Sequence, residues 1–73
     1  MIPEKSDKEW RRLITGENEV NFSSFALQMT VSRLKQSYQS KSLGLEAAID
    51  ELHAMCTKYK HAVKSDIDKI FKN

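Results

Sequence analysis

Apolar residues recur along the chain with helical spacing, in three segments separated by its few glycine and proline residues. These breaks fall at Pro3, Gly16 and Gly44. Within each segment the apolar positions return every three or four residues, as they do on one face of a helix. We therefore predict a single all-α domain over residues 1–73.

The first segment predicts a short helix over residues 7–15. Ser6 and Glu9 have the spacing of a capping box, in which each side chain accepts a hydrogen bond from the other residue's backbone amide. Gly16 follows where the end of a helix favours a left-handed residue. The apolar positions between them are Trp10, Leu13 and Ile14.

The second segment predicts a helix over residues 22–40. Asn21 is a favourable N-cap, and Val20 and Phe25 are spaced to contact each other across it as a hydrophobic staple. Steps of four, three and four residues then define an apolar seam like that of a coiled coil. Its members are Leu27, Val31, Leu34 and Tyr38.

The third segment has the most regular pattern and predicts one long helix over residues 44–71. Its seam consists of Leu45, Ile49, Leu52, Cys56, Tyr59 and Val63. If the chain reverses near residue 42, the two seams match, with Tyr38 opposite Leu45 and Leu27 opposite Cys56. We therefore predict a three-helix bundle built on an antiparallel, coiled-coil-like hairpin.

This hairpin leaves apolar residues uncovered on the second helix and at the end of the third. The predicted interface consists of Trp10, Phe22, Phe25, Met29, Ile67, Ile70 and Phe71. Two alternatives remain open, since either the first helix or a second chain would cover these residues. Small domains have little core and often associate, which favours an interface for self-association or for a protein partner.

Asp66 occupies a seam position where an apolar residue is expected. In the hairpin register it lies near residues 17–21, beside the free backbone amides at the start of the second helix. A carboxylate there accepts hydrogen bonds from those amides, or pairs with Arg11 or Arg12. We predict a structural role for it rather than a catalytic one.

Charge gives only limited information, because 12 basic residues stand against 10 acidic ones. The basic side chains do form a flank along the predicted helices, represented by Arg33, Lys35, Lys60 and Lys64. Such a flank is typical of a solvated helix face, and a role in binding nucleic acid is the less favoured alternative. The polar start of the chain and the lack of a long apolar run predict a cytoplasmic protein without membrane contact.

No combination of residues indicates catalysis, a cofactor or a metal. Asp50, His53 and Cys56 step around one side of the third helix, but they lack further converging ligands, and Cys56 belongs to the apolar seam. We predict a non-enzymatic protein–protein interaction module, such as an adaptor, a regulator or a small subunit. It is expected to form a homo-oligomer, with an accessory role in nucleic-acid binding as the alternative.

Overall fold

The computed structural model describes residues 2–71, which form four α-helices and no strand. These are α1 (Lys8–Thr15), α2 (Phe25–Gln39), α3 (Leu45–Lys58) and α4 (Lys64–Phe71). The predicted all-α class is confirmed. The predicted single long third helix is wrong, because that segment forms both α3 and α4.

The first helix begins one residue later than predicted and has a different N-terminal cap. Asp7, rather than Ser6, is the N-cap, and its carboxylate accepts a hydrogen bond of 2.9 Å from the Glu9 amide. Glu9 instead pairs with Arg12 one turn further along. The helix ends as predicted at Gly16, whose φ of 87° lies in the left-handed region that favours glycine.

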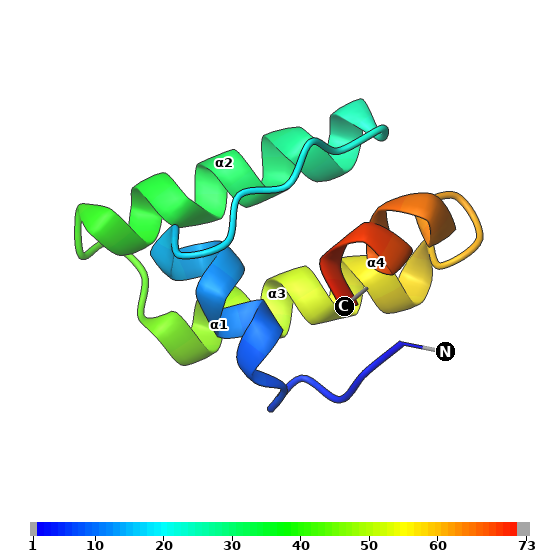
Figure 1. Ribbon diagram of the computed structural model, residues 1–73. Coiled ribbons are helices and arrows are strands. Elements are labelled where there is room, and N and C mark those ends of the chain that lie inside the picture. Colours follow the sequence, from blue (N-terminus) through cyan, green and yellow to red (C-terminus); the bar gives the residue numbers. More distant parts are fainter. Residues whose placement is uncertain (1, 72–73) are drawn as a thin grey trace.

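The second helix begins three residues later than predicted. Ser24, not Asn21, is its N-cap, and the Ser24 hydroxyl accepts a hydrogen bond from the Leu27 amide. The predicted inward face is otherwise correct, since Leu27, Val31 and Leu34 are all buried. Residues 17–24 therefore form an extended connection that leads from α1 to the far end of α2 (Figure 1).

The third segment bends at residues 59–63 and does not continue as one helix. Tyr59 closes α3 with non-helical dihedral angles, and its carbonyl accepts hydrogen bonds from the amides of Ala62 and Val63. An unbroken helix over 44–71 would measure roughly 40 Å, longer than the molecule's greatest extent of 31 Å. The bend instead brings Ile67 and Ile70 back to the core, where both are buried. Tyr59 leaves the predicted seam and is 48% exposed.

The four helices enclose one core between α2 and α3. These two helices run in opposite directions, with α1 at one end of the space between them and α4 at the other (Figure 1). Trp10 of α1 lies at the centre, fully buried, and its ring meets that of Phe71 edge-on at 4.9 Å between centroids. The first helix and the end of the chain therefore close the core together.

Asp66 is a charged residue within this core, with only 1% of its surface exposed. Its two carboxylate oxygens accept hydrogen bonds from the backbone amides of Ser23 (2.6 Å) and Ser24 (2.8 Å), at the start of α2. This is the predicted capping role, at residues 23 and 24 instead of 17–21. The alternative partners are engaged elsewhere, Arg11 with Glu46 and Arg12 with Glu9. Lys69 adds a longer contact of 3.8 Å to the same carboxylate.

Replacing Asp66 with alanine is expected to lower the free energy of unfolding by about 3 kcal/mol, because it removes two charge-assisted hydrogen bonds and leaves both amides without an acceptor. Denaturant unfolding followed by circular dichroism measures this change. Asp68→Ala is the matched control, since Asp68 lies on the same helix but is exposed, and it should change stability by less than about 0.5 kcal/mol. Equal effects of the two substitutions would contradict the bridging role of Asp66.

Candidate functional site

The outer face of α2 carries the most exposed large apolar residues of the described chain. Phe25 is 77% exposed and Met29 is 53% exposed. Both positions follow from the helix geometry: Ser24 caps the helix so that Phe25 is its first residue, and Met29 lies one turn further on the same side. Since Leu27, Val31 and Leu34 point inward, Phe25 and Met29 must point to solvent.

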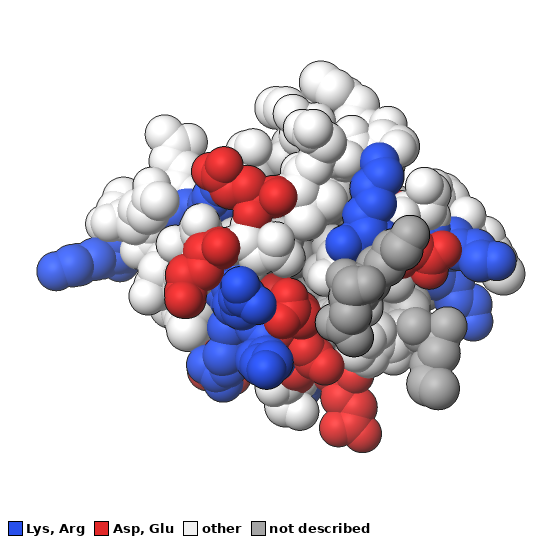
Figure 2. All heavy atoms as spheres, viewed as in Figure 1, with Lys and Arg blue, Asp and Glu red and all other residues white. Residues whose placement is uncertain are grey.

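This outer face is also uncharged along its whole length. Starting at Phe25, it continues through exposed residues at steps of four, three, four and three: Met29, Ser32, Gln36 and Gln39. The only charged residues of α2, Arg33 and Lys35, flank the stripe on either side. In Figure 2 the uppermost edge of the molecule, over α2, is white, and the charged side chains lie below it. Exposed faces of surface helices are ordinarily charged, so this stripe is unusual.

A shallow hollow of about 380 Å³ adjoins the uncharged stripe. Val20, Phe22 and Val31 contribute apolar atoms to its walls, and the stripe residue Ser32 is part of its rim. Phe22 is half-buried and packs against the core, so it helps to form this hollow instead of projecting from the surface. The hollow is otherwise lined mainly by polar residues, so the apolar part of this side of the molecule is centred on Phe25 and Met29.

Several residues of the predicted interface are not available to a partner. Trp10, Ile67 and Ile70 are at most 5% exposed, because the bend at residues 59–63 folds α4 onto α1 and buries all three inside the chain. Phe71 is half-buried against Trp10. The sequence missed this because a straight third helix leaves the same residues uncovered.

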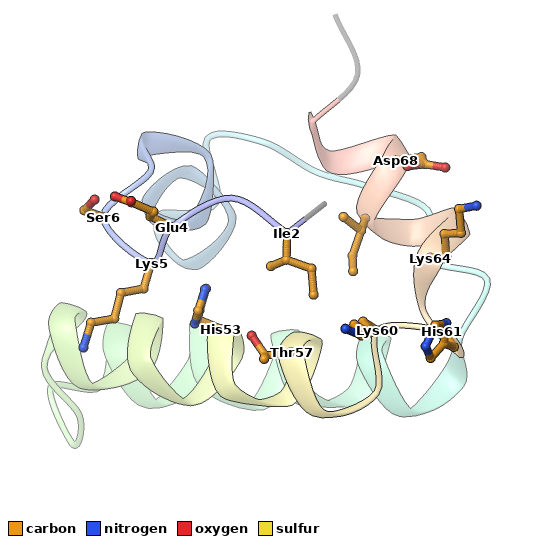
Figure 3. A pocket seen from close by; sticks show the side chains of 11 residues that line it. Ile2, Glu4, Lys5, Ser6, His53, Thr57, Lys60, His61, Lys64 and Asp68 are labelled. Carbon is orange, nitrogen blue, oxygen red and sulfur yellow. The ribbon is translucent and has the colours of Figure 1, made fainter.

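The four residues of the predicted basic flank do not gather on one surface. Arg33 of α2 forms an ion pair with Glu51 of α3, and the Lys35 side chain reaches towards Gly16. Lys60 and Lys64 lie elsewhere, on a groove of about 1000 Å³ (Figure 3). The bend between α3 and α4 forms this groove, which sequence periodicity gave no means of predicting.

The N-terminal residues form one wall of this groove and are fixed to the helices by specific contacts. His53 Nε2 donates a hydrogen bond of 3.1 Å to the Pro3 carbonyl, and Trp10 Nε1 donates one of 2.9 Å to the Glu4 carbonyl. Lys5 forms an ion pair of 3.2 Å with Asp50 of α3. The segment is therefore held along the side of α3.

Asp50, His53 and Cys56 do not form a joint site. Asp50 pairs with Lys5, while His53 binds the Pro3 carbonyl and meets the Trp10 ring edge-on at 5.6 Å. Cys56 is fully buried, and this burial raises the pKa of its thiol from 9.0 to about 11, with a further contribution from the Asp66 carboxylate. Within residues 2–71, no three potential metal ligands cluster.

No family model, curated protein or solved structure matches the chain. Among the described helices, none combines the length and the apolar character needed to cross a membrane. The features that bear on function are therefore two surfaces, the outer face of α2 and the groove.

The Cys56 thiol gives a stability that depends on pH in the alkaline range. Above pH 9.0 the thiol ionises in the unfolded chain, while the folded chain keeps its proton until about pH 11. The folded state then binds more protons, so this group lowers the free energy of unfolding as the pH rises through that interval and has no effect below it. At the middle of this pH interval, the loss in the free energy of unfolding due to Cys56 should be about 1 kcal/mol.

Urea unfolding of the wild type and of Cys56→Ala across this pH interval measures the effect. The substitution destabilises the protein at every pH by removing a buried side chain, so the slopes against pH are compared, not the absolute values. We expect the wild type to lose stability more steeply above pH 9.0. Parallel slopes would show that the thiol does not contribute.

Proposed function

We propose that the protein is a small helical protein–protein interaction module that associates with a second copy of itself through the outer face of α2. The observation that carries this proposal is the exposure of Phe25 (77%) and Met29 (53%) on a helix face without charge. Covering two such side chains is worth about 1.5–3 kcal/mol each if burial is complete. A module of this kind acts as an adaptor, a regulator or a small subunit.

The composition of the stripe favours a second copy as the partner. A charged partner surface finds no opposite charge among Ser32, Gln36 and Gln39, whereas an identical stripe meets neither repulsion nor an unpaired charge. If a twofold axis passes between Phe25 and Met29, then Phe25 of each copy faces Met29 of the other. The hollow beside the stripe is mainly polar, and only a minor part of its walls, including Val20 and Phe22, offers further apolar contact.

The size of the outer face of α2 limits the affinity that a dimer can reach. A helix of 15 residues is about 22 Å long, so the buried surface falls below the roughly 800 Å² per partner that is usual for a stable complex. We therefore expect a reversible dimer with a Kd in the micromolar range. Such an association suits a regulated module better than a permanent subunit.

Binding of nucleic acid, the alternative function, has less support from the arrangement of charges. Of the four basic residues predicted for it, Arg33 pairs with Glu51 and Lys35 lies apart from Lys60 and Lys64. A phosphate backbone requires several cations along one surface.

Self-association is tested by replacing Phe25 and Met29 together with glutamate. The double variant should stay monomeric where the wild type dimerises, with a Kd raised at least about tenfold, because the interface would have to bury carboxylates. Sedimentation equilibrium over a range of micromolar concentrations measures this. The fold should survive, because both side chains are exposed. The first turn of α2 also has no acidic residue, so a glutamate at position 25 interacts favourably with the positive end of the helix dipole.

Ala47→Glu is the matched control, because it adds an acid to the first turn of α3 at an exposed position away from α2. This variant should dimerise like the wild type. A wild type that remains monomeric at high micromolar concentration would overturn the proposal, as would a Phe25/Met29 double variant that associates normally.

A further inference from the structure

The groove beside α3 is a second surface, separate from the outer face of α2. Its walls come from the N-terminal segment, from the C-terminal half of α3 with the following bend, and from α4 (Figure 3). No residue of α2 lines it. Any binding there is therefore independent of self-association through α2.

The groove is preformed, because each wall is anchored to the rest of the molecule. The N-terminal wall is held by the hydrogen bonds from His53 to Pro3 and from Trp10 to Glu4. The α4 wall is held by the carboxylate of Asp66, which binds the start of α2. A ligand therefore does not have to meet the entropic cost of ordering these walls.

The floor of the groove is apolar and one end of it is basic. Ile2 projects into the middle from the N-terminal wall (Figure 3), and Ile67 of α4 also lines the groove. Lys60, His61 and Lys64 line the end formed by the bend. Figure 3 shows the Lys60 amine pointing into the groove, while the Lys64 amine and the Asp68 carboxylate both point away from its interior. Among the described residues, neither Lys60 nor Lys64 takes part in an ion pair, in contrast to Lys5 at the other end, which Asp50 neutralises.

The segment that leads into this end of the groove carries only positive charge. Residues 57–65 contain Lys58, Lys60, His61 and Lys64 and no acidic residue. Opposite charge at a partly enclosed surface both attracts a ligand and fixes its orientation. An apolar floor next to a basic end favours a ligand that carries apolar groups beside its acidic ones, and a nucleic-acid backbone lacks such apolar groups.

We propose that this groove binds an acidic segment of another protein. Apolar side chains of the segment rest on Ile2, beside the nearly buried Ile67, and its carboxylates meet Lys60 and His61, with Lys64 at the outer edge. The volume of about 1000 Å³ admits several residues of such a segment. Together with the outer face of α2, the groove gives the module a site for a partner other than itself.

A fluorescein-labelled peptide of alternating leucine and glutamate tests the proposal by fluorescence anisotropy. We expect binding that weakens as the salt concentration rises, because part of the attraction is between exposed charges. The double substitution Lys60→Glu and Lys64→Glu should weaken binding by roughly tenfold or more. Lys41→Glu is the matched control, since Lys41 is exposed in the turn at the opposite end of α3, and it should bind like the wild type.

Two further probes separate the contributions of charge and apolar contact. A peptide with serine in place of leucine should bind more weakly than the original, and Ile2→Ser should reduce affinity for the leucine peptide while leaving the thermal unfolding midpoint nearly unchanged. Ile2 is suited to this test because it is only half-buried, whereas Ile67 belongs to the core. Equal binding of the serine and leucine peptides would contradict the apolar floor.

The proposal is overturned if a peptide with lysine in place of glutamate binds equally well, or if the Lys60/Lys64 variant keeps full affinity. A short DNA duplex that displaces the acidic peptide and binds more tightly would assign the groove to nucleic acid instead. Repeating the titration with the Phe25/Met29 double variant distinguishes the two surfaces. Peptide binding that persists in that variant supports a groove that works without self-association, whereas binding lost together with the dimer would place the peptide at the α2 face.

Discussion

The arrangement of the helices depends on one buried carboxylate. Asp66 accepts hydrogen bonds from the amides of Ser23 and Ser24, more than forty positions earlier in the sequence. Those amides lie at the start of α2, where backbone donors lack partners within the helix, so the carboxylate satisfies a need of α2 and fixes α4 at once. Burying a charge is costly unless such partners are present. The geometry of α4 is therefore set by where those two amides lie.

Both candidate surfaces follow from this fixed position of α4. With α4 folded back, α1 and α4 fill the space between α2 and α3, and Trp10 meets Phe71 at the centre. Every helix that covers α2 then lies on its inner side, so Phe25 and Met29 stay exposed. On the far side of α3, the same bend leaves a groove between α4 and the N-terminal segment. The uncharged stripe and the groove thus both follow from the position of α4.

The sequence predicts the helical class and the inward positions well, because buried apolar residues repeat at helical spacing. Gly16 marks the end of α1, and the seam from Leu27 to Leu34 is buried as expected. Spacing cannot predict the bend after Lys58, since Val63 is buried in the bent chain and would also fit a straight seam. The N-caps were misplaced because Ser6, Asp7, Asn21 and Ser24 are all good capping residues, and tertiary contacts select among them. The one local sign of the bend was Asp66 itself, a charged residue at a seam position. The groove remained hidden because it joins the N-terminal residues to the last helix, two regions that no periodic pattern relates.

The energetic balance explains why the bent form is preferred to the straight helix. A straight third helix leaves Ile67, Ile70 and Phe71 uncovered, a loss of about 1.5–3 kcal/mol for each side chain. The bend loses a few helical hydrogen bonds at residues 59–63, and the Tyr59 carbonyl accepts hydrogen bonds within the turn that replace part of them.

The bend also places Lys60, His61 and Lys64 together at one end of the groove. Because α2 contributes nothing to that groove, two copies paired through α2 would present two grooves, and a partner with two acidic segments would gain avidity from binding both.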